Sequence, residues 1–503
     1  MKEFDIVAIG SGSGLMVIEA ALSKGLNCAV IEKSKIGGTC LNKGCIPSKM
    51  LVYPADLIKE AKEAKKIGLN FSEPVVDWEE VSKRMWGQID LNIKIEKNLK
   101  EVPNLTLYKG LGKFTSPNTM IIEDEDGNVI QEIKAKKFII ASGARSFVPP
   151  IKGLEEAGYV IPETFFGNKF PKKPWDRLVI IGGGAIGAEF ANIFSSFNTK
   201  VTILEMKPHI IATEEEEISK FVEKQFKKYD IDVFTNTGIV KIEKSGNNKL
   251  ITIEDLTTKK QKIIECDEIL MASGVRSNGD LLDLEKANVK VDAKGYIITD
   301  QYLQTSQKDI YAIGDINGKY QFRHKANYEA EVLIKNLFSN NKELKEVRYE
   351  NVPWTIFTHP QVAHAGLTQK ELKDNGIKHY VGYNYYSDVV AGRAMGYSRR
   401  DDDNGFAKIL VGEDKKILGI HVVGPQASLL VQPFVYLMNA GHECSSLVAN
   451  EKGISNCKDL DCLRVICPNL GTYEPINDSM IMHPSLNELT AWALEEVDWS
   501  KKE

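Results

Sequence analysis

The sequence lacks the features that usually mark nucleic-acid-binding and membrane-spanning proteins. Its 503 residues carry 64 Lys and Arg against 69 Asp and Glu, a net charge of −5. A chain without a basic surplus has little with which to neutralise a phosphate backbone or an anionic membrane. It also has no uninterrupted apolar run of about 18 residues, because the best stretch, 6–22, contains Gly, Ser and Glu19. We therefore expect neither nucleic acid nor a membrane as partner, and small ligands instead.

Cysteine is scarce, and signal-peptide features are missing. Only 8 residues are Cys, and four of them crowd between Cys444 and Cys467, which indicates local chemistry rather than a secretory disulfide framework. The first five residues include two acids where a signal peptide needs net positive charge, so we expect a cytoplasmic protein. Hydrophobic residues at 43% and charged residues at 26% are ordinary for globular chains. At about 150 residues per domain, the length predicts three or four domains.

Residues 4–32 predict a strand, a glycine-rich turn, a helix and a second strand that ends on Glu32. The turn contains Gly10, Gly12 and Gly14. Such glycines let the backbone approach a pyrophosphate at the helix N-terminus, and an acid about 20 residues further on accepts a hydrogen bond from a ribose. Leu15 stands where the usual pattern has its third glycine, so we expect the helix and strand to pack slightly differently.

The same pattern returns in full from Leu178. Its glycines are Gly182, Gly184 and Gly187, and its second strand, 200–204, is followed by Glu205. Two such units predict two nucleotide cofactors, one held tightly and one exchanging, as in a flavoprotein reductase. Two matching stretches, 139–145 and 270–276, end in small-residue turns where we expect the chain to cross between domains.

Two further regions complete the organisation of the chain. A buried strand over 309–316 is predicted to end in Gly314-Asp315, which would bring a carboxylate to a cofactor hydroxyl. From about Arg348 the sequence alternates in short strands (352–357, 405–411 and 417–423) before a helix over 429–440. This alternation predicts a third, α+β domain.

The strongest chemical signal is the segment 37–49, Gly-Gly-Thr-Cys-Leu-Asn-Lys-Gly-Cys-Ile-Pro-Ser-Lys. Cysteines five apart on a regular helix have Cα atoms about 8 Å apart, beyond the roughly 4.4 to 6.8 Å that a disulfide allows. Cys40 and Cys45 therefore need an irregular turn, for which Gly44 supplies the freedom. The spacing fits a reversible disulfide, and the alternatives are a pair of unreactive thiols or half of a metal site.

These residues, with both nucleotide turns and a C-terminal His483-Pro-Ser-Leu-Asn-Glu488, resemble the class I pyridine nucleotide-disulfide oxidoreductases over nearly the whole chain. The resemblance implies an α/β fold with two Rossmann-like dinucleotide-binding domains, for FAD and NAD, and an α+β C-terminal dimerisation domain. The implied boundaries are 1–150 and 276–345 for FAD binding, 151–275 for NAD binding, and 346–503 for dimerisation.

The same resemblance assigns the cofactor residues, with no metal ligand among them. FAD would be bound by Gly10, Gly12, Gly14, Glu32, Lys49, Gly143, Gly314 and Asp315. NAD would be bound by Gly182, Gly184, Gly187, Glu205 and Gly274.

The resemblance also implies the catalytic roles. Cys45 would be the charge-transfer thiolate beside the flavin, and Cys40 the thiol that attacks the substrate. His483 would be the acid-base group, oriented by Glu488, because thiol–disulfide exchange needs a proton carrier that works near neutral pH.

Lys49, one helical turn after Cys45, would pair with Glu189 near the reactive nitrogen of the flavin. In this family the base acts on the disulfide of the opposite subunit, so a homodimer is expected. His359-Pro360 also resembles family sequence, and we interpret it as structural.

The expected reaction is that of a dihydrolipoyl dehydrogenase, dihydrolipoamide and NAD⁺ giving lipoamide and NADH, with a lipoyl-bearing protein among the expected partners. Glu205 favours NADH, because a carboxylate accepts from a ribose diol and repels a 2′-phosphate. The turn 10–15 and the stretches 322–329 and 386–397 resemble instead the mycothione-reductase-like branch, whose member would reduce another low-molecular-weight disulfide. A flavin electron-transfer protein is a third possibility.

The third possibility depends on an apparent insertion at about 443–470. It contains Cys444, Cys457, Cys462 and Cys467. Their spacing matches neither the paired cysteines of structural zinc sites nor the common ferredoxin run. Two interpretations stay open: spare thiols in a lid or dimer contact, or a second dithiol or metal that relays electrons.

Overall fold

The computed structural model describes residues 1–339, 344–414, 416–440, 474–477, 479–484. Contacts between Cα atoms divide the chain into two compact units, Met1–Arg348 and Tyr349–Glu503, and each is considered by itself. No helix within the described residues is long and apolar enough to cross a membrane. The insertion cysteines and Glu488 lie outside the described residues, so the expectations for them stay predictions.

The first unit is built on a seven-stranded sheet in the order β3-β2-β1-β6-β5-β4, with β16 added beside β6. Its strands are β1 Lys2–Ile9, β2 Cys28–Glu32, β3 Leu105–Lys109, β4 Leu111–Ser116, β5 Thr119–Glu123, β6 Val129–Ile140 and β16 Ile310–Ala312. β1 pairs in parallel with both β2 and β6, and its Val7 and Ala8 are fully buried. A parallel sheet needs cover on both faces, which explains why these strands are apolar without alternation.

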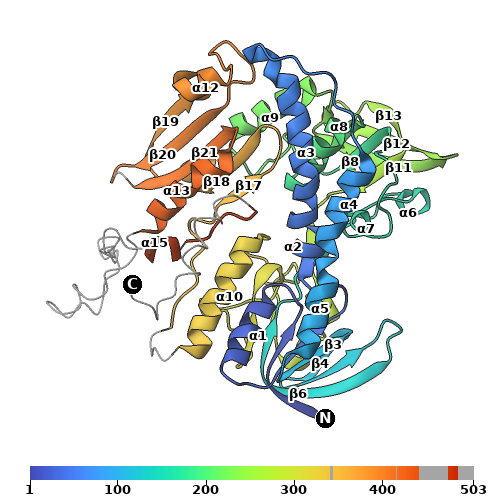
Figure 1. The fold of residues 1–503 in the computed structure, drawn as a ribbon, viewed down its shortest axis with the longest axis vertical. Coiled ribbons are helices and arrows are strands. Elements are labelled where there is room, and N and C mark those ends of the chain that lie inside the picture. Colours follow the sequence, from blue (N-terminus) through green and yellow to red (C-terminus); the bar gives the residue numbers. More distant parts are fainter. Residues whose placement is uncertain (340–343, 415, 441–473, 478, 485–503) are drawn as a thin grey trace. The chain divides into compact units, whose positions relative to one another are not determined.

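Two helices pack together on this sheet. α1 (Gly14–Ser23) follows the first glycine turn, and α10 (Arg323–Phe338) lies beside it (Figure 1). In the sequence just before α10, the strand predicted over 309–316 is shorter than expected. β16 spans three residues, and the chain then turns at Gly314 (φ +78°) into the 3₁₀ turn η4 (Gly314–Asn317).

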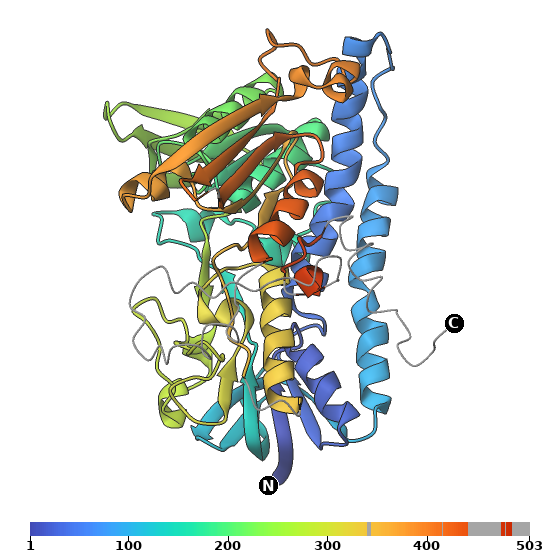
Figure 2. The ribbon, with the colours of Figure 1, turned by 90° about the vertical axis from the view of Figure 1, so that its left-hand side faces the viewer.

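The redox segment opens a series of helices. α2 (Gly38–Lys43) and α3 (Cys45–Glu63) meet at Gly44, whose φ of −137° and ψ of −118° are not helical. The 3₁₀ turn η1 (Ala64–Ile67), α4 (Trp78–Ile89) and α5 (Leu91–Glu101) follow. α3 and α4 lie side by side as the long blue helices of Figures 1 and 2. The irregular turn that the cysteine spacing required is therefore present.

The middle of the first unit repeats the strand–turn–helix–strand pattern. Its parallel sheet has the order β10-β9-β8-β14, and a three-stranded antiparallel sheet, β11-β12-β13, accompanies it. The elements are α6 Leu154–Ala157, α7 Pro162–Phe165, β8 Arg177–Ile181, α8 Ala185–Ser196, β9 Lys200–Leu204, α9 Glu216–Lys228, β10 Asp232–Phe234, β11 Thr237–Ser245, β12 Asn248–Asp255, β13 Gln261–Cys266 and β14 Glu268–Met271.

The two matching small-residue turns meet where the chain passes between these sheets. β7 (Ala144–Ser146) and β15 (Val275–Ser277) form a two-stranded antiparallel sheet in which Arg145 stands opposite Arg276. Arg145 binds Asp280 through both Nη atoms, at 2.8 and 2.6 Å. The 3₁₀ turns η2 (Gly279–Leu281) and η3 (Leu284–Ala287) follow β15. Both chain crossings expected from the sequence are thus fixed to each other.

The second unit is a five-stranded antiparallel sheet in the order β17-β18-β21-β20-β19. Its elements are β17 Trp354–Ile356, β18 Gln361–Gly366, α11 Gln369–Asp374, β19 His379–Tyr385, η5 Tyr386–Asp388, α12 Val390–Ala394, β20 Phe406–Gly412, β21 Ile417–Gly424, α13 Ala427–Asn439 and α15 Glu474–Asn477. Val431 and Val435 of α13 pack on Ala363 and Val422 of the sheet. The α/β fold class with an α+β C-terminal domain is confirmed. The finer domain boundaries stay predictions.

Candidate functional site

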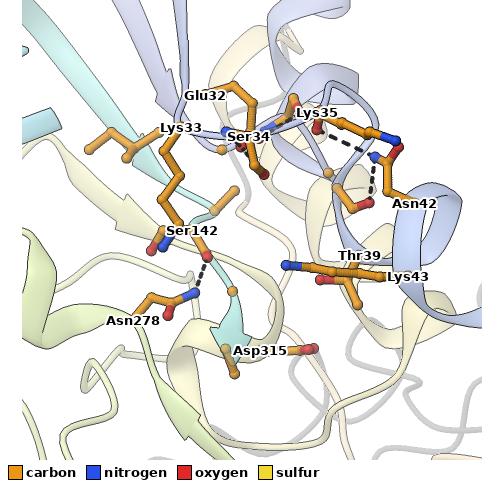
Figure 3. Close-up of a pocket in the computed structure, with 18 of the residues that line it drawn as sticks. Glu32, Lys33, Ser34, Lys35, Thr39, Asn42, Lys43, Ser142, Asn278 and Asp315 are labelled. Carbon is orange, nitrogen blue, oxygen red and sulfur yellow. Dashed lines mark hydrogen bonds between the residues drawn. The ribbon is translucent and has the colours of Figure 1, made fainter. Parts of the chain in front are cut away.

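A cavity in the first unit opens at the carboxyl ends of β1, β2 and β6 (Figure 3), where parallel sheets usually bind ligands. Its wall is formed by the first glycine turn, Glu32, the redox segment, the turn Ala141–Ala144, Asp315 and Arg323. Five of the eight residues that the sequence assigned to FAD line this cavity, Gly14 follows a lining residue, Gly314 precedes one, and Lys49 lies one turn into α3. The cavity therefore collects residues that are far apart in the sequence.

Gly14 of the glycine turn and Gly38 of the redox segment are packed too closely for side chains. A Cβ on Gly38 (φ +67°) would lie 2.8 Å from the Cα of Gly12, so the turn and the redox segment touch through backbone. A Cβ on Gly14 would lie 3.1 Å from that of Ala141 and 3.4 Å from that of Ala8. Gly14 thus supplies the close helix–strand approach that the sequence pattern expected one position later, at Leu15.

The Glu32 carboxylate fastens two loops at the rim of the cavity. Its Oε2 accepts hydrogen bonds from the backbone N and Oγ of Ser11, at 3.0 and 2.7 Å. Its Oε1 accepts from the backbone N and Oγ of Ser34, at 2.9 and 3.0 Å. Ser11 Oγ also accepts from the backbone N of Gly37, at 2.9 Å, which links the turn to the redox segment. Sequence reasoning missed both serines, because short polar residues in turns are common.

The redox cysteines face each other on the cavity wall. Their Sγ atoms lie within 4.8 Å of each other, and the two side chains are hydrogen-bonded. This hydrogen bond and burial raise the pKa of the Cys40 thiol well above its usual range, while the charges of Arg323 and Lys49 oppose the rise. Cys45 is the first residue of the 19-residue helix α3, where the helix dipole favours negative charge on its sulfur. The two thiols are thus placed in different electrostatic surroundings.

An ion pair joins α3 to α8. The Lys49 Nζ lies 2.7 Å from the Glu189 Oε2, and the side chains are 22% and 12% exposed. The structure therefore brings together Lys49 and Glu189, the two residues that the family resemblance implied would pair.

A second, deeper contact joins the same helices and was not expected from the sequence. Lys59 is buried in α3, and its Nζ donates a hydrogen bond to the Asn192 Oδ1 of α8 at 2.5 Å. The Nζ also lies 4.4 Å from the centre of the Tyr229 ring, a cation–π distance. Burial lowers the pKa of Lys59 to about 7. Two lysines of α3, ten residues apart, thus both bind side chains of α8.

A fully buried ion pair supports the turn that carries Asp315. Lys325 and Glu329 of α10 are both 0% exposed, and their charged atoms lie 3.2 Å apart. The Lys325 Nζ donates to the Gly314 carbonyl and the Asn317 Oδ1, both at 2.9 Å. The Glu329 carboxylate accepts from the Gly314 N and the Asn317 Nδ2, both at 2.7 Å. The charged side chains of Lys325 and Glu329 are thus both used to hold η4.

Asp315 itself lies on the cavity wall (Figure 3). Burial raises its pKa to about 6, and the positive charge of Lys325 opposes the rise. The i, i+4 spacing of Lys325 and Glu329 in a helix just after Gly314-Asp315 was the signal that could have identified this support.

The cavity contains polar atoms that need a partner. The buried Asn42 Oδ1 and Ser142 Oγ, both on the cavity wall, have no hydrogen-bond partner among the residues that the structure describes. Asn42 Nδ2 donates to the carbonyls of Ile36 and Gly38, and Asn278 Nδ2 donates to the Ser142 carbonyl (Figure 3). Buried polar groups are rarely left unpaired, so these two atoms point to a polar ligand. The glycine turn, helix N-terminus and acidic rim fit a dinucleotide such as FAD.

The second glycine turn has the geometry that the sequence predicts for a nucleotide. A Cβ on Gly187 would lie 2.0 Å from the Gly182 carbonyl oxygen, so only glycine allows this approach of α8 to β8. The Glu205 carboxylate accepts from the backbone N of Gly183 at 2.7 Å and of Lys207 at 2.8 Å. Each carboxylate oxygen therefore keeps capacity for a ribose hydroxyl. Gly184 precedes α8, and Gly274 (φ +103°) follows β14.

His483 lies in the second unit, at the end of a segment held by α13. Gln432, 1% exposed, donates from Nε2 to the Met480 carbonyl at 3.3 Å and accepts from the Met482 N at 3.0 Å. Met482 is itself buried in the core of this unit. Gln432 thus positions the residues that lead into His483, a function that a single polar residue in an apolar helix does not reveal in sequence.

Comparisons with known proteins agree with this arrangement. Residues 4–330 match the family described as pyridine nucleotide-disulphide oxidoreductase, and residues 352–455 match its dimerisation domain. The chain is 31% identical to the mycothione reductase of Mycobacterium tuberculosis, over 88% of this chain and 94% of that protein. It is 33% identical to the dihydrolipoyl dehydrogenase of Chlamydia pneumoniae, over 86% and 89%.

A solved structure is similar over the same extent. The Cu(II) complex of the HOCl-induced flavoprotein disulfide reductase RclA from Escherichia coli has a TM-score of 0.74 at 25% identity, covering 89% of this chain and 97% of that one. Members of the matched family bind FAD and NAD(P). The chain therefore belongs to the pyridine nucleotide-disulphide oxidoreductase family and is a flavoprotein disulfide oxidoreductase.

Proposed function

We propose that this enzyme is an NAD-linked dihydrolipoyl dehydrogenase that works as a homodimer. The overall reaction converts dihydrolipoamide and NAD⁺ into lipoamide, NADH and a proton. The observation that carries the redox part of the proposal is the Cys40–Cys45 pair on the wall of the cavity that also contains the first glycine turn. The match to the family's dimerisation domain supports the homodimer.

FAD, when bound, supplies the two-electron chemistry that connects a nicotinamide to a disulfide. The Cys40–Cys45 disulfide oxidises the substrate dithiol by exchange, so the substrate becomes a disulfide and the cysteines become two thiols. We assign Cys40 as the sulfur that a substrate thiolate attacks, forming a mixed disulfide and releasing Cys45, and Cys45 to the electron exchange with the cofactor. The position of Cys45 at the start of α3 supports this assignment, because the helix dipole favours its thiolate.

The proton steps need a group that titrates near neutral pH, and we assign them to His483 of the partner subunit. In thiol–disulfide exchange the attacking thiol must lose a proton and the leaving sulfur must gain one. An imidazole can accept the first proton and donate the second. Glu488 is our choice for the carboxylate that orients this ring. The Lys49–Glu189 pair is assigned to the electrostatic environment of the cofactor, because it is tied to the same helix as Cys45.

Glu205 supports NAD(H) over NADP(H). Its carboxylate is fixed by the backbone N of Gly183 and of Lys207, so it would accept a ribose diol and repel a 2′-phosphate. In the FAD cavity, the Glu32 carboxylate already accepts four hydrogen bonds from Ser11 and Ser34. A ribose hydroxyl that binds Glu32 would therefore replace one of the serine hydroxyls as donor.

A second candidate is a mycothione-reductase-like reductase of another small disulfide. The 31% identity over 88% of this chain supports it about as well as the 33% identity supports the first candidate. Steady-state turnover separates the two. We expect NAD⁺ reduction with dihydrolipoamide to exceed NADH oxidation by a panel of cysteine- and glucosamine-containing disulfides. A higher kcat/KM with any of those disulfides would replace lipoamide by that compound.

A further inference from the structure

Arg323 is a cation in an electrostatically unfavourable place. It is the first residue of the 16-residue helix α10, whose first turn contains no acidic residue. A positive side chain at a helix N-terminus is repelled by the helix dipole. Among the residues that the structure describes, no carboxylate lies within the 4 Å of an ion pair with its guanidinium. No ion pair with a described carboxylate therefore offsets this repulsion.

The guanidinium faces the cavity at the glycine turn. Arg323 lines the cavity together with Gly12, Gly38, Thr39 and Asp315. Its Nη1 lies 3.9 Å from the position that a Cβ of Gly12 would occupy, and no other atom is within 4 Å of that position. In this turn type, the second glycine is the point where the backbone lets a pyrophosphate approach. The arginine side chain thus borders the space that Gly12 leaves open.

The surrounding charges also call for a cation there. The turn from Gly10 to Gly14 carries no basic residue, and α1 has no charged side chain in its first turn. Asp315 lies on the same wall, where burial raises its pKa, and a hydrogen bond from Cys45 and burial raise the pKa of Cys40; the positive charge of Arg323 opposes both increases. Lys33, Lys35 and Lys43 also line the cavity, but among the described residues the Arg323 Nη1 is the one side-chain atom within 4 Å of the position of a Cβ on Gly12.

We propose that Arg323 is a side-chain ligand of the FAD pyrophosphate, with its guanidinium donating to the phosphate oxygens over Gly12. This inference rests on the flavin cofactor of the proposed function but does not depend on which disulfide is the substrate. A guanidinium matches phosphate geometry with two parallel donors, which lysine does not reproduce. Arg323 therefore compensates the negative charge of the cofactor at the site where α1 and α10 both begin.

The test measures FAD retention by the purified holoenzyme. Flavin fluorescence released on serial dilution gives the FAD dissociation constant of the wild type, Arg323→Gln, Arg323→Lys and Arg84→Gln at low and high salt. Arg84 is an exposed arginine of α4 outside the cavity, so its variant controls for the loss of one guanidinium. Circular dichroism of each variant, with excess FAD, reports folding.

We expect Arg323→Gln to bind FAD about 10- to 100-fold more weakly, the usual effect of losing a charged hydrogen-bond partner. Arg323→Lys should recover part of the affinity, and Arg84→Gln should bind as the wild type does. The wild-type affinity should also fall more steeply with salt than that of Arg323→Gln, because one ion contact fewer is screened.

Two results would overturn the proposal. Unchanged FAD affinity in a folded Arg323→Gln variant would remove the pyrophosphate contact, whatever the disulfide substrate is. If affinity is unchanged but the pH profile of Cys40 alkylation moves upward, the arginine acts on the thiol instead. A wild type that binds FAD but turns over no disulfide would count against the proposed function, and the assignment of Arg323 to the pyrophosphate would still be decided by the FAD affinities.

Discussion

Replacing Lys325 by Met should destabilise the first unit strongly, because the substitution leaves a buried carboxylate without its cation. Lys325 and Glu329 are both 0% exposed, and their charged atoms lie 3.2 Å apart. Removing one partner of a buried ion pair typically costs about 3–5 kcal/mol of the free energy of unfolding. Lys325→Met also removes the donors to the Gly314 carbonyl and the Asn317 Oδ1, which places the expected loss at the upper end.

The double variant Lys325→Met/Glu329→Leu tests the cause of that loss. With both charges gone, Glu329 no longer leaves a buried carboxylate unpaired, and the double variant should regain stability relative to Lys325→Met alone. Lys335→Met, an exposed position of the same helix, is the matched control and should cost less than about 1 kcal/mol. Urea unfolding followed by tryptophan fluorescence measures all four proteins. A loss below about 1 kcal/mol in Lys325→Met, or a double variant less stable than the single one, would refute the reasoning.

Three further changes test other parts of the structure. Lys59→Met should remove a pH dependence of the free energy of unfolding. The pKa of Lys59 is lowered to about 7 from 10.5, so between these pH values the unfolded state holds a proton that the native state lacks. Above pH 7, the stability of the wild type should therefore rise relative to that of the variant by up to about 1.4 kcal/mol per pH unit. Thermal melts from pH 7 to 10 check this, and a constant difference would contradict it. His483→Ala should slow the disulfide half-reaction about 10²- to 10⁴-fold but leave flavin reduction by NADH unchanged in stopped-flow traces, whereas equal losses would make His483 structural. Glu205→Ala should reduce the preference for NADH over NADPH in kcat/KM, and a wild type that prefers NADPH would contradict the role of Glu205.

The fold was largely predictable from the sequence because its strongest signals are local. The glycine turns at Gly10 and Gly182 each require a strand before them and a helix after them, and both are present within one or two residues of the expected bounds. The cysteine spacing required a break between two helices, and Gly44 provides it. Backbone geometry at such points admits few residues, so the sequence records it directly.

The supporting side chains were not predictable in the same way. The hydrogen-bond partners of these side chains are far away in the sequence: 21 residues for Ser11, 133 for Asn192 and 50 for Gln432. No local sequence pattern therefore indicates their roles. The signal for Lys325 and Glu329 existed as a four-residue helical spacing, but a charged pair in a helix is most often a solvent-exposed one. Only burial distinguishes the two cases, and burial depends on how the whole chain packs.

The central claim is that electrons from NADH reach a disulfide formed by Cys40 and Cys45. It is tested most directly by trapping new thiols after anaerobic addition of NADH to the FAD-loaded protein, with mass spectrometry of the alkylated peptides. Lys43 lies between the two cysteines, so trypsin releases them on separate peptides, 36–43 and 44–49. The account predicts that both peptides become alkylated only after NADH, and that Cys45→Ser abolishes the NADH dependence at Cys40. Equal alkylation of both peptides with and without NADH would contradict it.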